Sequence, residues 1–246
     1  CSASAKRIDE VLQCEDELKE ASTDEYPVVD TDVFVEFDNV TFSYEGKKPD
    51  VENISFKLYK GQSLGIIGAT GSGKSTIIKL LLRFYDADSG SIRINGKDIR
   101  TIERKNLYSM FGTAMQNDFL YADTIEENIS FGRNIDIETI REAAKIAQAD
   151  DFISAFPDGY SHVLAQKGTN VSGGQKQRIL ITRALAGNPQ ILVLDDSSSA
   201  LDYKTDSLVR QQIKKNLKDK TIIIVAQRIG TIMDADKIIV LDNGQI

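Results

Sequence analysis

Residues 68–75 read GATGSGKS, and their types and spacing suit the binding of phosphate groups. The three glycines can adopt backbone angles that turn successive N–H groups toward one point. An apolar strand is expected before this stretch and a helix after it, so the positive end of the helix dipole adds to the attraction. Lys74 supplies a point charge for the β- and γ-phosphates, and the Ser75 hydroxyl can bind Mg²⁺.

The complete pattern G-x-x-x-x-G-K-[ST] between a strand and a helix predicts a nucleotide-binding loop. A glycine-rich turn with a chance lysine is the alternative, and the flanking strand and helix count against it. The residues expected to contact the nucleotide are Gly68, Ala69, Thr70, Gly71, Ser72, Gly73, Lys74, Ser75 and Thr76.

Two adjacent aspartates follow an apolar run in the stretch ILVLDD, residues 191–196. Such a run predicts a strand that is buried on both faces, with two carboxylates at its end. Two like charges so close need a cation or a shared task. We interpret Asp195 as the acid that binds Mg²⁺ beside Ser75. An exposed pair of acids that caps a strand is the alternative.

A glycine pair occurs in VSGGQKQR, residues 171–178. The Ser172 hydroxyl and the N–H groups of Gly173 and Gly174 would lie at the start of a helix, where an anion binds well. Glycine pairs are common in loops, so this stretch predicts an anion site only together with the phosphate loop and the two aspartates.

The elements that would position these residues alternate between strands and helices. Strands are predicted in VFVEFDNVTFSY, ISFKL, SLGIIG, ILVLDD, TIIIVA and KIIVLDNG, and SIRING ends in the Asn-Gly signal of a tight hairpin. A helix is predicted in STIIKLLLRFY, and residues 118–187 are mostly helical in pattern. This order predicts an α/β core with a largely parallel sheet and an inserted helical part.

The composition of the chain argues against several classes of protein. The chain has 246 residues, 41% apolar content and a net charge of −7, which disfavours a nucleic-acid partner. It contains no apolar run of about 18 residues, the length that predicts a membrane span. Cys1 and Cys14 are its two cysteines, which argues against a disulfide framework and for a reducing compartment.

Residues 4–20 form an amphipathic pattern with apolar positions at Ile8, Val11, Leu12 and Leu18. The predicted helix is either a surface helix packed on its own domain or the tail of a helix that arrives from an upstream domain. An acidic stretch, STDEYPVVDTD, reads as a linker. The chain opens at Cys and stops at NGQI, and we expect it to be a fragment of a longer protein.

Together, GATGSGKS, VSGGQKQR and ILVLDD resemble the nucleotide-binding domain of ATP-binding cassette (ABC) proteins, and VSGGQKQR resembles that family's signature sequence. The resemblance implies a P-loop NTPase (RecA-like) core with an N-terminal antiparallel β subdomain and an inserted α-helical subdomain. It implies ATP and Mg²⁺ as cofactors. The expected divisions are a linker at 1–32 and the domain at 33–246, made of an ATP-binding core at 33–117 and 188–246 and a helical part at about 118–187.

The resemblance also implies roles for single residues. Tyr44 in FDNVTFSY would stack on the adenine, although a lone tyrosine is more often ordinary packing. Gln116 would lie near Mg²⁺ and the attacking water. The stretch SALD, 199–202, resembles the loop that crosses a dimer interface. In this family two cassettes enclose two ATP molecules, so the signature residues Ser172, Gly173, Gly174 and Gln175 would serve the nucleotide of the partner.

The sequence departs from the family pattern at two positions that carry chemistry. Asp196 stands where the family has a glutamate that positions or deprotonates water, and its carboxylate is set back by roughly 1.5 Å. Gln227 stands where the family has a histidine, and an amide neither carries charge nor relays a proton. The chain's one histidine, His162, precedes the signature and reads as a surface loop residue.

Two smaller departures follow the same comparison. Val171 replaces the leucine that usually begins the signature. Ala165, Gln166 and Lys167 replace a Gly-Glu-Arg run that exporter members usually carry.

The resemblance extends to exporters through TIEENISFG, and the loss of both Glu and His resembles the degenerate half of a heterodimeric exporter. It implies an ABC-type ATPase with low activity of its own, in which Asp196, Gln227 and Gln116 hold the catalytic positions and Ser75, Gln116 and Asp195 bind the metal. The implied partners are ATP, a second, non-identical cassette and a transmembrane domain of the same longer chain, with no nucleic acid. The implied location is the cytoplasmic face of the cell membrane.

Two other functions stay open. One is a soluble ABC ATPase with a regulatory or nucleic-acid-linked role. The other is a structural partner that binds nucleotide without turnover, which Asp196 and Gln227 would also fit.

Overall fold

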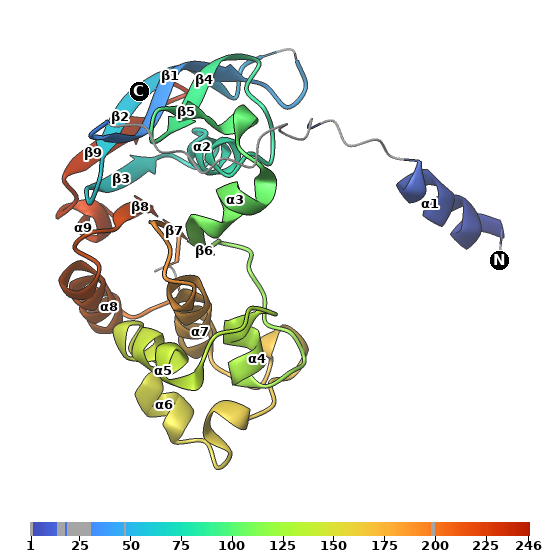
Figure 1. The fold of residues 1–246 in the computed structure, drawn as a ribbon, viewed down its shortest axis with the longest axis vertical. Helices are drawn as coiled ribbons and strands as arrows, with labels where there is room; N and C mark the ends of the chain where they lie inside the picture. Colours follow the sequence, from blue (N-terminus) through green and yellow to red (C-terminus); the bar gives the residue numbers. More distant parts are fainter. Residues whose placement is uncertain (1, 14–17, 19–30, 47, 198–199) are drawn as a thin grey trace.

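In the computed structural model, residues 2–13, 18, 31–46, 48–197 and 200–246 are described (Figure 1). Their centre is a parallel sheet of five strands in the order β6-β7-β8-β3-β9. The strands are β3 (Ser63–Gly68), β6 (Phe111–Ala114), β7 (Ile191–Asp195), β8 (Thr221–Val225) and β9 (Lys237–Leu241). All five residues of β7 are buried, as its unbroken apolar run predicts.

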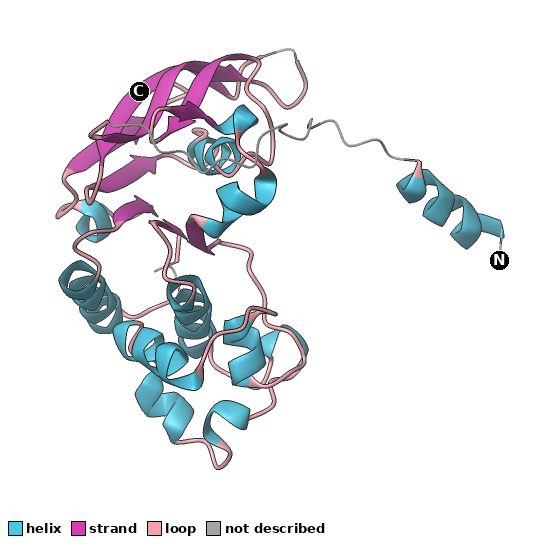
Figure 2. Ribbon diagram, in the orientation of Figure 1, coloured by secondary structure: helices cyan, strands magenta, loops and turns pink. Residues whose placement is uncertain are grey.

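A second, antiparallel sheet lies beside the first, at the top of Figure 2. Its order is β2-β1-β4-β5, from β1 (Val33–Phe42), β2 (Val51–Tyr59), β4 (Ser89–Ile94) and β5 (Lys97–Asp98). The predicted Asn-Gly hairpin joins β4 to β5, and Asn95 and Gly96 both have positive φ, as this tight turn requires. Helix α2 (Lys74–Leu81) packs between the two sheets, because Ile77, Ile78, Leu80 and Leu81 belong to the apolar cluster that joins them.

The chain between β6 and β7 is mostly helical, and Figure 1 shows it below the sheets. It contains α4 (Ile125–Ser130), α5 (Ile137–Ile146), α6 (Asp150–Ser154), α7 (Gly173–Ala186) and the short 3₁₀ turns η2 (Gly159–Ser161) and η3 (Gln166–Gly168). A second apolar cluster joins these helices to α8 (Tyr203–Asn216) and to β7 and β8. The architecture confirms the predicted α/β fold with a parallel core, an antiparallel β part and an inserted helical part.

The other described elements are short. They are η1 (Ile99–Thr101) and α3 (Arg104–Ser109), which precede β6, and α9 (Ile229–Ile232), which precedes β9. None of the described helices has both the length and the apolar content that crossing a bilayer requires.

Helix α1 (Ser2–Leu12) covers the first part of the amphipathic helix predicted at 4–20, and most of the remainder lies outside the described residues. Figure 1 shows α1 apart from the other elements. Ile8 is 61% exposed and Leu12 is 78% exposed. These two side chains are therefore not packed on the domain, which argues against the first of the two interpretations for this part of the helix.

Candidate nucleotide-binding site

The phosphate loop leaves the end of β3 and enters the first turn of α2. Gly71 and Gly73 have φ values of 81° and 99°, angles that favour glycine. Gly68 is not left-handed, so the expectation that all three glycines serve to turn the backbone is wrong for this one. A Cβ at Gly68 would lie 2.3 Å from the carbonyl oxygen of Leu241. Glycine is needed there because β9 approaches the loop too closely for any side chain.

The N-terminus of α2 carries unsatisfied donors. Its N-cap residue is Gly73, which offers no side chain to the first backbone N–H groups of the helix. Lys74 Nζ lies inside the loop, where it donates to the carbonyl oxygens of Gly68 at 2.8 Å and Ala69 at 2.7 Å. The loop therefore brings together free N–H groups, a helix dipole and an ammonium group, which is the donor set that polyphosphates bind.

The phosphate loop borders a cavity of about 300 Å³. It is lined by Asp50, Thr70, Gly71, Gly73, Lys74, Ser75, Thr76, Gln116, Asp195, Asp196, Val225, Ala226 and Gln227. The fold thus gathers the phosphate loop, the two aspartates, Gln116 and Gln227 around one space, as the sequence predicts.

Ser75 and Asp195 both line this cavity and are in direct contact. Ser75 Oγ donates to Asp195 Oδ2 at 3.1 Å, and Asp195 is only 3% exposed. Burial raises the pKa of Asp195, the Ser75 hydrogen bond opposes that rise, and the neighbouring charge of Asp196 adds to it. A cation held between the hydroxyl and the carboxylate would relieve this penalty.

The donor chemistry fits Mg²⁺ bound together with a nucleotide. Mg²⁺ prefers oxygen ligands and is typically held by one or two protein oxygens with substrate phosphates and water. Among the described residues no group of three or more His, Cys, Asp or Glu side chains is placed to hold a metal by itself. The metal would therefore depend on the phosphates as well as on Ser75 and Asp195.

One carboxylate oxygen of Asp196 accepts hydrogen bonds from two amide side chains. Gln227 Nε2 donates to Asp196 Oδ2 at 2.9 Å, and Gln116 Nε2 donates to the same oxygen at 3.3 Å. Asp196 has a φ of 51°, a left-handed angle that Asp tolerates better than most residues. Burial raises the pKa of Asp196, and the Gln227 hydrogen bond opposes that rise. All three residues predicted at catalytic positions therefore meet in one cluster.

Tyr44 lies at the rim of the site. It is 41% exposed, and its hydroxyl donates to Thr76 Oγ1 at 3.4 Å, which places it beside the first turn of α2. Its ring makes edge contacts with Phe42 and Tyr85, and Lys79 Nζ lies 5.3 Å from its centroid. The exposed aromatic ring next to the phosphate loop is well placed to stack on a base.

The signature residues lie away from the cavity. Ser172 is the N-cap of α7, where Ser172 Oγ accepts from Gln175 N and Gln175 Oε1 accepts from Ser172 N. Gly173 and Gly174 face Ala200 and Leu201, and a Cβ at Gly174 would lie 3.4 Å from the Ala200 carbonyl oxygen. The structure therefore does not join Ser172–Gln175 to Lys74 within one chain. Ser199 of the predicted SALD loop lies outside the described residues.

Two other predicted features are also separate from the cavity. His162 stacks on Phe156, with ring centroids 4.1 Å apart, so it is a half-buried packing residue rather than a bare surface one. In the 165–167 stretch, Lys167 has a φ of 61° and its N–H donates to the Leu120 carbonyl oxygen.

Sequence reasoning missed Asp50. It lines the cavity, and its Oδ2 accepts from the backbone N–H of Tyr44 at 2.9 Å. Asp50 lies in a loop without a recognisable motif, so nothing in the local sequence indicates this position.

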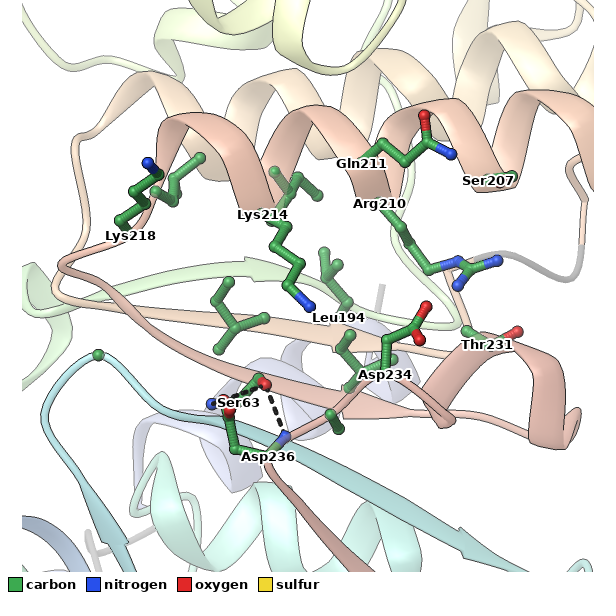
Figure 3. Close-up of a pocket in the computed structure, with 16 residues that line it drawn as sticks. Ser63, Leu194, Ser207, Arg210, Gln211, Lys214, Lys218, Thr231, Asp234 and Asp236 are labelled. Atoms are coloured by element: carbon green, nitrogen blue, oxygen red, sulfur yellow. Dashed lines mark hydrogen bonds between the residues drawn. The ribbon is translucent and has the colours of Figure 1, made fainter.

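A second cavity, of about 380 Å³, lies elsewhere in the fold (Figure 3). It lies between α8 and the segment that carries Asp234 and Asp236, at the amino ends of β3 and β8. Figure 3 shows Arg210 and Lys214 extending from α8 toward that segment, while Asp236 is already bonded to Ser63. Ligands of parallel sheets bind at the carboxyl ends of the strands, where the phosphate loop is, and not at this edge.

Comparison with known proteins agrees with this geometry. A model of the ABC transporter family matches residues 51–199. The putative multidrug export ATP-binding/permease protein YgaD of Bacillus subtilis is 44% identical over 214 residues, which are 86% of this chain and 37% of that protein. ATP-binding cassette sub-family B member 6 of Xenopus tropicalis is 42% identical over 213 residues, 86% of this chain and 25% of that protein.

A solved structure is similar over nearly the whole chain. It is described as a bacterial Atm1-family ABC exporter with ATP bound, and its TM-score is 0.91 at 35% sequence identity. The match covers 99% of this chain and 43% of that chain. This chain therefore spans less than half the length of each of these three proteins.

Proposed function

The chain belongs to the ABC transporter family, and from that membership we propose that it is the ATP-binding domain of an exporter whose own nucleotide site is degenerate. In this proposal ATP binding and hydrolysis at the interface of two such domains drive export. The relatives named as exporters and the solved exporter structure support the transport role. The observation that carries the degenerate character is the contact of Gln227 with Asp196.

Binding is the first task of the site. Lys74 and the N–H groups of the α2 N-terminus hold the phosphates, and Tyr44 stacks on the adenine. Ser75 and Asp195 would hold Mg²⁺ with Gln116 beside them, and the bound metal would neutralise charge on the phosphates. Asp50 positions Tyr44 through the bond to its N–H.

Hydrolysis needs a group that orients water and accepts its proton. Asp196 is the carboxylate at that position, but both amides donate to its Oδ2. The two amides occupy the acceptor oxygen that an attacking water would use, and the shorter side chain holds the carboxylate back from the phosphates. Gln227 adds no positive charge where negative charge moves during transfer. The site therefore holds nucleotide well and turns it over slowly.

The signature is assigned to the partner's site. Ser172, Gly173 and Gly174 present a hydroxyl and N–H groups at the start of the 14-residue helix α7, yet none of them lines this chain's cavity. A second cassette that faces this one would place its own nucleotide against them. We propose that this partner is non-identical and supplies the glutamate and histidine that Asp196 and Gln227 replace.

A membrane partner is the remaining proposal. Phe119, Tyr121 and Phe131 are 47%, 46% and 51% exposed, and the last two border a cavity of about 270 Å³ next to α4. Arg183 stiffens this surface, because its guanidinium donates to the Asn128 carbonyl oxygen at 2.7 Å and lies over the Phe131 ring. We propose that a transmembrane domain of the longer protein docks there, at the cytoplasmic face of the membrane.

The test is the ATPase rate of the chain alone and of the double variant Asp196→Glu with Gln227→His. The chain should bind Mg-ATP and turn it over far more slowly than the roughly 1–10³ s⁻¹ common for enzymes. The double variant should be faster by about 10²-fold, the contribution expected of a positioned acid–base group. Adding Lys74→Ala to the double variant should abolish the gain, which locates it at this site. A parent rate within the ordinary enzyme range would contradict the proposal.

A further inference from the structure

The last turn of the chain touches the phosphate loop. Asn243 and Gly244 form an Asn-Gly turn after β9, with φ values of 49° and 81°. Gly244 N–H donates to the Ser72 carbonyl oxygen at 3.2 Å, and the Gly244 carbonyl oxygen accepts from Glu52 N–H at 2.8 Å. One residue thus bridges the loop and the first residues of β2, segments that are far apart in sequence.

The bridge leaves no space for a side chain. A Cβ at Gly244 would lie 2.7 Å from the Asp50 carbonyl oxygen and 3.3 Å from Val51 Cα. Gly73 in the phosphate loop faces the same backbone, since its Cβ would lie 2.9 Å from the Asp50 carbonyl oxygen and 2.7 Å from Val51 Cγ1. Gly73 and Gly244 therefore both pack against the Asp50 carbonyl oxygen, and they approach Val51 at its side chain and its backbone respectively.

Asp50 connects the two glycines to Tyr44, the residue proposed to stack on the base. Its carboxylate accepts from the Tyr44 N–H, while its carbonyl oxygen packs against the two glycines. Asp50 thus contacts the phosphate loop through its carbonyl oxygen and the backbone of Tyr44 through its carboxylate. A displacement of this backbone by a fraction of an ångström would change both halves of the site together.

We propose that the Asn243–Gly244 turn is a positioning element of the nucleotide site, which sets the spacing between the phosphate loop and the tyrosine that stacks on the base. Gly244 is not among the residues that line the cavity, and it acts through Ser72, Gly73 and Asp50. The inference rests on the proposed function, because it concerns the same ATP site.

The chain contains its own control for this idea. Asn95 and Gly96 form a second Asn-Gly turn, with nearly the same φ values of 50° and 78°. That turn joins β4 to β5, and its Asn95 N–H donates to the Phe34 carbonyl oxygen. Alanine at Gly96 or at Gly244 meets the same unfavourable backbone angle, so the two variants share that strain. They differ in their contacts, because Gly244 meets the Asp50 carbonyl oxygen and donates to the Ser72 carbonyl oxygen of the phosphate loop, whereas the Asn95–Gly96 turn contacts Phe34.

The experiment measures Mg-ATP affinity by calorimetry and the melting temperature without nucleotide, for the full 246-residue chain and both variants. Gly244→Ala and Gly96→Ala should both lower the melting temperature. Gly244→Ala alone should raise the Kd for Mg-ATP, by about tenfold, the size expected when hydrogen bonds to a charged group are misaligned. Asparagine tolerates the left-handed angle but also has a Cβ, so Gly244→Asn should show the same loss of affinity. This variant replaces the alanine variant in the experiment if the alanine variant does not fold.

The outcomes are distinct. If the parent binds Mg-ATP and either Gly244 variant binds as tightly as Gly96→Ala, the turn is only a structural feature and the inference is wrong. A parent chain that binds no Mg-ATP would overturn the proposed function, and the inference with it.

Discussion

Gln227 Nε2 lies 2.9 Å from Asp196 Oδ2 and donates a hydrogen bond to it, across 31 residues of sequence. The resemblance to the family predicts a departure from its pattern at both residues, and the fold places them in direct contact. Gln116 donates to the same oxygen from a third segment. The two substitutions therefore act on one group of atoms and not at two separate places.

In the function that we propose, this contact is the reason why the site retains nucleotide. An amide that donates to a carboxylate favours its ionised form, and the amide itself cannot accept or release a proton. A histidine at the same place could change its charge near neutral pH, which Gln cannot. Replacing one residue alone would leave the other mismatched, so the gain from restoring both should exceed the sum of the single changes.

Lys74→Ala should strongly weaken Mg-ATP binding even though turnover is slow. The change removes the ammonium that neutralises the phosphates, a charge-assisted contact worth about 1.5–3 kcal/mol, so the Kd should rise at least tenfold. Lys215→Ala, at an exposed position on α8, removes the same charge from the chain away from the site and should leave the Kd unchanged. Calorimetry that finds equal affinity for the Lys74→Ala chain and the parent would show that the phosphate loop is assigned wrongly.

Asp195→Asn should stabilise the nucleotide-free chain near pH 7. Burial raises the pKa of Asp195 in the folded state, so its contribution to stability is fully present below the unfolded pKa and is lost as pH rises through the folded value. Asparagine removes the charge, so the variant should melt higher than the parent at pH 7, by about 2–4 °C for each kcal/mol gained. The difference should disappear toward about pH 3, below the ordinary pKa of Asp.

Asp136→Asn gives a control of opposite sign. Asp136 caps α5, and its hydrogen bonds to the side chain and N–H of Thr139 lower its pKa. Its contribution to stability is present above the unfolded pKa and is lost as pH falls, so this variant should be the less stable one at pH 7. Thermal melts of both variants between pH 3 and about pH 7 separate the two cases. An Asp195→Asn chain that melts below the parent at neutral pH would contradict the burial of an uncompensated charge.

Gly112→Ala should destabilise the packing that holds the signature helix. A Cβ at Gly112 in β6 would lie 2.1 Å from the Ala184 carbonyl oxygen of α7 and 2.7 Å from Pro189 Cγ. Overpacking of this kind costs about 1–3 kcal/mol of unfolding free energy. Gly230→Ala in α9 meets no heavy atom within 4 Å and should be neutral or stabilising by up to about 1 kcal/mol. Urea denaturation measures both, and equal stabilities would mean that β6 and α7 are not packed this closely.

Local patterns in the sequence predict much of this molecule. The phosphate loop is a continuous motif, and the buried strand β7 is a continuous apolar run, so both are visible without the fold. The helical pattern expected within residues 118–187 divides into separate helices, and α5 and α6 are two of them because Gln148 takes a φ of 56° between them. Apolar spacing does not reveal a single left-handed residue of that kind.

Contacts between distant segments are what the sequence does not reveal. Asp50 reaches Tyr44 from a loop, Leu241 approaches Gly68 from β9, and Gly244 packs against Asp50 across almost the whole domain. Each depends on which strands are neighbours in the sheets, which no local pattern states. The role of Gly68 was misjudged for that reason, since the motif suggests a turn and the fold imposes a lack of space.

The most direct test of the account is steady-state ATPase activity of this chain paired with its partner cassette, with Ser172→Ala or Asp196→Asn in this chain. Donors aimed at the partner's γ-phosphate are worth roughly 10²–10³-fold in rate, so Ser172→Ala should lower activity strongly. Ser172 also caps α7, and Thr124→Ala, which removes the matching cap of α4, controls for that loss and should change the rate little. Asp196→Asn should lower activity only mildly, because it faces the slow site. If Asp196→Asn abolishes turnover while Ser172→Ala leaves it intact, this chain houses the hydrolytic site and the two sites are reversed.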